Sequence, residues 1–127
     1  SAVSHAYGDH AFAQRCASEA ATLAANIEAH AWDGAWYRRA YFDDGTPLGS
    51  HAGAECRIDS ISQSWAVLSG VAGPERAQRA MDAVAAHLVR PAAGLVQLLD
   101  PPFDKADLKF GDKVIRRGRP PGPSRDR

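Results

Sequence analysis

The stretch SISQSWAVLSGVAGPERAQRAMDAVAAHLVRP, residues 60–91, decides the fold because it predicts two helices joined by a short glycine-containing turn. In its first half, Ile61, Trp65 and Leu68 have the spacing of one helical face, and Ser60 is the expected N-cap. In its second half, a Pro-Glu pair suits the first turn of a helix. The buried stripe of that second helix is expected to consist of Ala77, Met81, Val84 and Leu88. We therefore expect an αα-hairpin.

A longer helix is expected upstream, from about residue 9 to residue 30, with Asp9 as its N-cap. Its apolar residues recur every three or four positions and so share one face: Phe12, Cys16, Ala20, Leu23 and Ile27. From Trp36 the period changes to two, and Asp44-Gly45 then offers a tight turn, which predicts a β-hairpin or a long ordered loop over residues 36–58. Residues 95–99 are expected to be extended.

The composition excludes several classes of protein. The 127 residues carry 15 Lys and Arg against 15 Asp and Glu, and 45% are hydrophobic. No apolar run reaches the roughly 18–20 residues that cross a membrane, and two cysteines are too few for a disulfide framework or a thiolate zinc site. A membrane protein, a disulfide-stabilised scaffold and a strongly basic nucleic-acid binder are therefore excluded, and a globular cytoplasmic protein is expected.

The charge is distributed unevenly along the chain. Residues 1–103 hold 7 Arg, no Lys and 11 acidic residues, whereas residues 104–127 hold 8 basic and 4 acidic residues. Such a shift is typical of a domain edge or a tail. We therefore expect a folded part over residues 1–104 and a basic, Pro- and Arg-rich disordered tail over residues 105–127.

Two stretches carry candidate chemistry. Five of the ten aromatic residues lie within 11 positions, beside acidic and arginine side chains: Trp32, Trp36, Tyr37, Tyr41 and Phe42. Rings that cover the apolar face of a sugar, next to charged groups that bond its hydroxyls, are typical of sugar binding, but a hairpin packed on a helix explains the same pattern. The second stretch places polar residues at the start of the second helix, where they form either a capping network or a substrate wall: Glu55, Arg57, Asp59 and Gln63. The scattered histidines predict no metal site.

Three separated motifs carry a resemblance to a known family. They are WDGAWYRRAYFDDGTPLGS at 32–50, ECRIDSISQSWAVLSG at 55–70 and LVQLLDPPFD at 95–104. Over about residues 9–104 the chain resembles the inverting glycoside phosphorylases of the cellobiose phosphorylase family, glycoside hydrolase family 94, formerly glycosyltransferase family 36. Within that family it is most similar to the C-terminal region of cyclic β-1,2-glucan synthases.

The resemblance implies a fold and a reaction. The fold would be mainly α, with this chain as a slice of an (α/α)₆ barrel. The reaction would be phosphorolysis of a β-glucoside: one carboxylic acid protonates the glycosidic oxygen while phosphate attacks the anomeric carbon from the opposite face, which gives α-glucose 1-phosphate. Inorganic phosphate would be the co-substrate, with no other cofactor.

The resemblance also limits what this chain is expected to do. In the family, the general acid lies in a Trp-Asn-Asp segment upstream of the matched region, and the phosphate site is completed downstream by Arg-Glu-Asn-Gly-Gly and Tyr-Thr-His segments. This tail matches neither downstream segment, as after a reading-frame change or a truncation. No catalytic residue and no metal ligand is therefore assigned, and the isolated chain is expected to be inactive. The candidate sugar contacts that the resemblance places near the mouth of the barrel are Glu55, Arg57, Asp59 and Gln63. Trp36 and Tyr37 are further candidates, for which a place in the barrel core remains the alternative.

The expected partners are a β-glucoside or β-glucan, the remainder of the parent catalytic domain and a second copy of the chain, with no nucleic-acid or membrane contact. A cytoplasmic location is expected, even for a parent anchored at the inner membrane. Two other hypotheses remain open: a non-catalytic helical module that binds sugar or protein, and a pseudogene product without function.

Overall fold

The computed structural model describes residues 2–104, 108–110 and 113–115 of the chain. Its helices are α1 (Ala2–Ala6), α2 (His10–His30), α3 (Ser60–Leu68), α4 (Pro74–His87) and a 3₁₀ turn, Pro91–Ala93. Its strands are β1 (Ala40–Tyr41), β2 (Pro47–Leu48), β3 (Ile58–Asp59), β4 (Val89–Arg90), β5 (Leu95–Val96), β6 (Leu99–Asp100), β7 (Leu108–Phe110) and β8 (Lys113–Ile115). The strands form antiparallel pairs β1–β2, β3–β6, β4–β5 and β7–β8. The described part is thus mainly helical with short strands.

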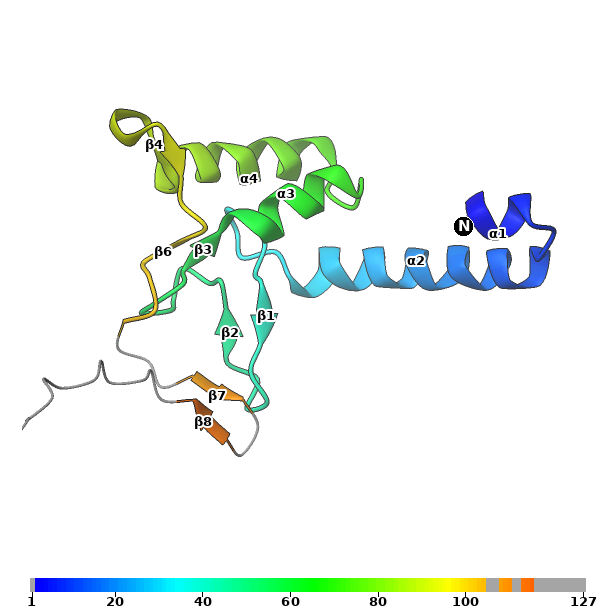
Figure 1. Ribbon diagram of the computed structural model, residues 1–127, viewed down its shortest axis with the longest axis horizontal. Coiled ribbons are helices and arrows are strands. Elements are labelled where there is room, and N and C mark those ends of the chain that lie inside the picture. Colours follow the sequence, from blue (N-terminus) through cyan, green and yellow to red (C-terminus); the bar gives the residue numbers. More distant parts are fainter. Residues whose placement is uncertain (1, 105–107, 111–112, 116–127) are drawn as a thin grey trace, which may run out of the picture.

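The long helix α2 is confirmed by the structure. Asp9 caps it, since the Asp9 carboxylate accepts a hydrogen bond from the Phe12 N–H at 3.0 Å. The predicted apolar face, however, is largely uncovered: the exposed fraction of Leu23 is 60% and that of Phe12 is 52%. Figure 1 shows why, because most of α2 extends away from the rest of the fold with α1 beside its N-terminal end.

The αα-hairpin is also confirmed, with two corrections. The N-cap of α3 is Asp59 rather than Ser60, because the Asp59 carboxylate reaches the Ser62 N–H at 2.9 Å. In α4 the buried face carries Ala80, Ala83 and Val84, whereas the predicted core residue Met81 is 40% exposed. Small side chains allow α4 to pack closely, so its alanines face the core.

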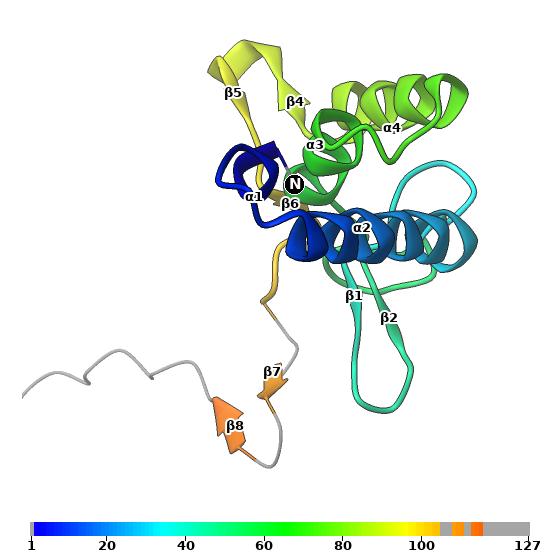
Figure 2. The ribbon, with the colours of Figure 1, turned by 90° about the vertical axis from the view of Figure 1, so that its right-hand side faces the viewer.

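The β-hairpin extends from one side of the helices (Figure 2). Within this hairpin the ladder consists of two pairs between β1 and β2, Ala40 with Leu48 and Tyr41 with Pro47. The strand predicted to begin at Trp36 is therefore shorter than expected. Trp36 and Tyr37 are consecutive and both buried, each in a different hydrophobic cluster. The predicted alternation therefore fails at these two residues.

Two small hydrophobic clusters hold the loops to the helices. One joins Trp36 and Ile58 to Ala83 and Val84 of α4 and to Leu88, which follows the helix. The other joins Tyr37 to Ala66 of α3 and Ala80 of α4, with Trp32 at its margin. Both clusters lie between the hairpin base and the αα-hairpin, which is where the candidate site residues gather.

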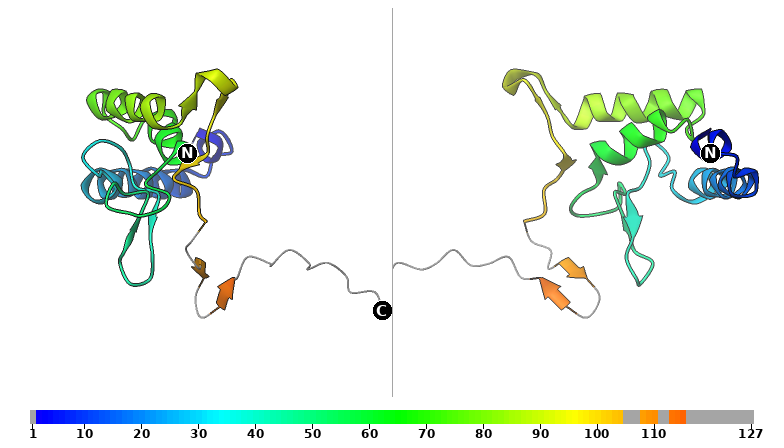
Figure 3. Two further views of the ribbon diagram at one scale, coloured as in Figure 1. Left: turned by 90° about the vertical axis from the view of Figure 1, so that its left-hand side faces the viewer. Right: turned by 45° about the vertical axis from the view of Figure 1, so that its right-hand side comes forward.

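The C-terminal part of the described chain returns to the helices. Strand β6 pairs with β3, and the Cys56 N–H donates to the Pro101 carbonyl at 2.8 Å. Figure 3 shows this segment running down past the start of α3. In the region predicted to be a disordered tail, β7 and β8 instead form a strand pair, and its remaining residues lie outside the described ones.

Candidate functional site

Gln63, on the first turn of α3, is fully buried and serves the backbone. Its side-chain oxygen accepts from the Tyr37 N–H at 2.8 Å, and its amide nitrogen donates to the Tyr37 carbonyl at 2.9 Å and to the Asp59 carbonyl at 3.1 Å. Both the oxygen and the nitrogen of this amide are thus hydrogen-bonded to backbone groups within the chain. Gln63 joins α3 to the hairpin base instead of facing a sugar.

Asp59 is likewise fully buried, and its carboxylate is occupied by donors. Besides capping α3, it accepts from the Ser62 hydroxyl at 2.8 Å and forms an ion pair with Arg39 at 3.4 Å. A buried carboxylate is stable only where such partners surround it. Asp59 therefore belongs to a capping network at the start of α3, which was one of the two predicted alternatives, the other being a substrate wall.

The two aromatic candidates also face inward. The Trp36 indole N–H is shared between the carbonyl oxygens of Gly49 at 3.0 Å and Arg57 at 2.9 Å, which joins both arms of the hairpin. The Tyr37 hydroxyl donates to Glu28, and burial together with this carboxylate raises the pKa of Tyr37 to about 12. Both side chains are therefore buried in the fold, with 8% of Trp36 and 2% of Tyr37 exposed.

Glu55 and Arg57 differ from the other four candidates because neither is buried: Arg57 is exposed and Glu55 is half-buried. Between them, Cys56 is buried and has a φ of 44°, so the chain turns sharply and directs its neighbours outward. The Arg57 Nε donates to the His51 carbonyl at 3.0 Å, and a Glu55 oxygen accepts from the Asp104 N–H at 2.9 Å. Of the six predicted sugar contacts, Arg57 is thus the one whose side chain is exposed, and Glu55 is half-buried.

A cluster that the sequence reasoning missed lies next to Arg57 and is centred on Asp33. The Asp33 side chain is fully buried and accepts from Arg38 at 2.6 and 2.7 Å and from the Ser50 hydroxyl at 3.1 Å. Its second oxygen accepts from the His51 N–H at 2.7 Å and lies 2.7 Å from His51 Nδ1. The sequence carries no periodic signal for this cluster, since its members lie up to 18 positions apart.

The electrostatics of this cluster keep Asp33 ionised. Burial alone acts to raise the Asp33 pKa, but the hydrogen bonds from the His51 backbone and ring, Arg38 and Ser50 together lower it below its ordinary value of 3.8. A carboxyl group that is already ionised at neutral pH cannot donate a proton to a glycosidic oxygen. Asp33 is therefore suited to orient cations and N–H groups.

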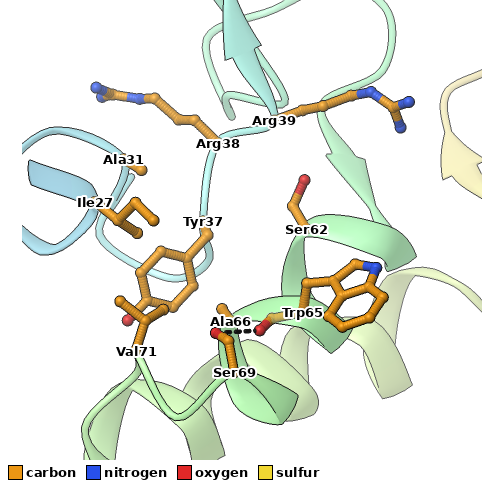
Figure 4. A pocket seen from close by; sticks show the side chains of 10 residues that line it. All are labelled: Ile27, Ala31, Tyr37, Arg38, Arg39, Ser62, Trp65, Ala66, Ser69 and Val71. Carbon is orange, nitrogen blue, oxygen red and sulfur yellow. Dashed lines mark hydrogen bonds between the residues drawn. The ribbon is translucent and has the colours of Figure 1, made fainter. Parts of the chain in front are cut away.

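A hollow of about 260 Å³ lies between the end of α2 and α3. Figure 4 shows its apolar part, formed by Ile27, Ala31, Tyr37 and Val71, with Arg38 and Arg39 projecting in opposite directions at one rim. Trp65 lines the other side and is 64% exposed. Of the six predicted sugar contacts, only Tyr37 lines this hollow.

Within the described ranges, no group of three or more His, Cys, Asp or Glu side chains could hold a metal ion. Nor does any helix in the described part have the length and apolar character to cross a membrane.

The sequence of this chain was compared with known protein families and with known proteins. Residues 1–119 match the glycosyl hydrolase 94 superfamily, catalytic domain. The chain is 56% identical over 96 residues, 76% of its length, to the cyclic β-(1,2)-glucan synthase NdvB of Rhizobium meliloti (strain 1021). It is 37% identical over 103 residues (81%) to a solabiose phosphorylase of Paenibacillus borealis, and 36% identical over 88 residues (69%) to a cellobionic acid phosphorylase of Neurospora crassa. The matched stretches cover 3%, 13% and 11% of those three relatives, so the chain spans a small part of each.

Proposed function

Because this chain belongs to the glycosyl hydrolase 94 superfamily, a family of carbohydrate-active enzymes, we propose that it is a segment of a domain that acts on β-glucosides or β-glucans. Relatives named as a glucan synthase and as phosphorylases share its sequence over most of its length, which supports this substrate class. The membership also confirms the resemblance carried by the three sequence motifs.

The proposed reaction of the whole domain is phosphorolysis or the related glucosyl transfer. In phosphorolysis the bond from the anomeric carbon to the glycosidic oxygen breaks as a bond to a phosphate oxygen forms, while a carboxylic acid gives its proton to the departing oxygen. The product is α-glucose 1-phosphate. Inorganic phosphate is the co-substrate in this proposal.

The described residues of this segment are proposed to bind sugar without supplying the acid. A general acid needs a pKa raised toward the working pH, whereas the pKa of Asp33 is lowered. The Asp59 carboxylate is enclosed by Ser62 and Arg39. The observation that carries the proposal is the polar edge formed by the exposed side chains of His51 and Arg57. The buried Asp33 carboxylate holds the His51 ring, and the His51 backbone carbonyl holds the Arg57 guanidinium.

The helices are proposed to form a slice of a helical barrel whose other helices cover the exposed apolar side chains. On α2 and α3 these side chains are Phe12, Leu23, Ile61, Trp65 and Leu68. Several large apolar side chains exposed on one helix are typical of a face that another element covers. The partner is the remainder of the catalytic domain, and in its absence a second copy of the chain.

Calorimetric titration of the 127-residue chain with linear β-1,2-glucan oligosaccharides tests the binding proposal. Substitution Arg57→Ala is expected to weaken binding about tenfold, because a hydrogen bond to a charged group is lost. Arg15→Ala, on the exposed surface of α2, removes the same charge away from the edge and is the matched control. Absence of binding by the unsubstituted chain, or equal losses in the two variants, would contradict the proposal.

A further inference from the structure

His51 is held at one ring nitrogen while the rest of its side chain is open to solvent. Its Nδ1 lies 2.7 Å from Asp33 Oδ2, and its own backbone N–H donates to the same oxygen at 2.7 Å. The His51 side chain is nevertheless 63% exposed, while the Asp33 side chain is fully buried. The ring is therefore fixed in position without being enclosed.

The hydrogen-bond inventory around Asp33 decides which ring nitrogen carries the proton. Asp33 also accepts from Arg38 and from the Ser50 hydroxyl, so this carboxylate is surrounded by donors. An ionised carboxylate can only accept hydrogen bonds. The short contact from His51 Nδ1 is therefore an Nδ1–H donation to Asp33, and the lowered pKa of Asp33 is consistent with the ionised state.

The proton on Nδ1 fixes what the opposite ring nitrogen of His51 can do. Nδ1 is occupied by Asp33, and the Arg57 Nε donates to the His51 backbone carbonyl at 3.0 Å rather than to the ring. In the neutral ring with its proton on Nδ1, Nε2 is left with a lone pair and can only accept.

We propose that Asp33 is a positioning residue that holds His51 in the Nδ1–H tautomer, so that His51 Nε2 accepts a hydrogen bond from a hydroxyl group of the bound sugar. This inference rests on the proposed function, because it names how the polar edge recognises its ligand. The neighbouring Arg57 guanidinium donates hydrogen bonds only. Together the two side chains give the edge one acceptor and one donor, which matches a hydroxyl group, since a hydroxyl can both give and receive a hydrogen bond.

The tautomer is measured first, in the free chain, by long-range proton–nitrogen correlation spectra of the histidine rings. In the neutral imidazole of His51, Nδ1 is expected to carry the proton and Nε2 to be unprotonated. A His51 ring that carries its proton on Nε2, or that exchanges between both tautomers, overturns the proposal. This outcome is independent of sugar binding and needs no variant to fold.

Substitution then separates positioning from a general structural role. Asp33→Asn replaces the carboxylate by a neutral amide, which holds the Nδ1 proton less strongly, so His51 is expected to populate both tautomers. Asp59→Asn is the matched control, because Asp59 is also buried and paired with an arginine but does not contact His51. An unchanged tautomer in Asp33→Asn, or the same change in both variants, refutes the positioning role.

Titration with linear β-1,2-glucan oligosaccharides tests the ligand. The His51 Nε2 resonance is expected to shift on binding. Substitution His51→Ala is expected to weaken binding about five- to tenfold. His30→Ala, which removes another exposed imidazole, is the control and is expected to leave the binding affinity unchanged. Binding that leaves His51 Nε2 and the His51→Ala affinity unchanged refutes this inference alone. Absence of any binding refutes the proposed function with it, even where the tautomer is as expected.

Discussion

Substitution Gln63→Ala is expected to unfold much of the chain, because Gln63 is a structural side chain. Gln63 is fully buried and makes three hydrogen bonds to backbone groups, two of them to Tyr37. Truncation leaves the buried Tyr37 N–H and carbonyl without these partners. Each unsatisfied group costs about 1–3 kcal/mol, so a loss of about 3–5 kcal/mol is expected.

That magnitude is large beside the roughly 5–15 kcal/mol by which whole domains are stable. Gln78→Ala is the matched control, since Gln78 is exposed on α4 and its amide nitrogen donates to the neighbouring Asp82 carboxylate at 2.9 Å. Such a surface pair contributes about 0.2–0.5 kcal/mol. Urea unfolding followed by far-ultraviolet circular dichroism at low temperature measures both variants. A midpoint for Gln63→Ala within the range of the control would refute the structural role and favour the predicted sugar contact.

Three further outcomes are expected. Gly49→Ala is expected to destabilise the fold far more than Gly45→Ala in the same urea assay. Both glycines have φ near 80°, but only at Gly49 would the new Cβ lie 2.7 Å from the Arg39 backbone nitrogen. Equal losses of unfolding free energy in the two variants would refute the clash. The Tyr37 pKa is raised from 10.0 to about 12, so between these pH values the native state keeps a proton that the unfolded state loses, and stability falls as the pH rises from 10 to 12. In Tyr37→Phe this dependence of stability on pH is expected to flatten, and an unchanged slope contradicts the raised pKa of Tyr37. Leu23→Glu lowers the sedimentation-derived mass if copies associate through the exposed face of α2, whereas an unchanged oligomer excludes that face.

The parts of the fold that the sequence predicted are those with local causes. The α2 helix and its Asp9 cap follow from spacing and from one side chain reaching a free N–H. The helix α4 was also predicted, and its inner face was predicted in part: Val84 and Leu88 are buried as expected. Met81 is not, because hydrophobicity ranks it above alanine while close packing places Ala80 and Ala83 inside. Trp65 is 64% exposed, and no described element covers it.

The site was less predictable because its residues are brought together by tertiary contacts. Gln63 and Asp59 lie at a helix start, where a capping network and a ligand contact have the same sequence pattern, and only their hydrogen bonds distinguish the two. Asp33 and His51 belong to separate loops, and no spacing rule connects them. His51 on its own resembled a surface histidine, and the contact with a buried carboxylate gives it a different chemistry.

The most direct test of the account is a measurement of α-glucose 1-phosphate release by the 127-residue chain from linear β-1,2-glucan at saturating phosphate. We predict sugar binding at the edge formed by His51 and Arg57 without product, because the two buried carboxylates of the candidate site, Asp33 and Asp59, are both held by donors. Steady release of α-glucose 1-phosphate would contradict it, since the chain would then supply the general acid itself.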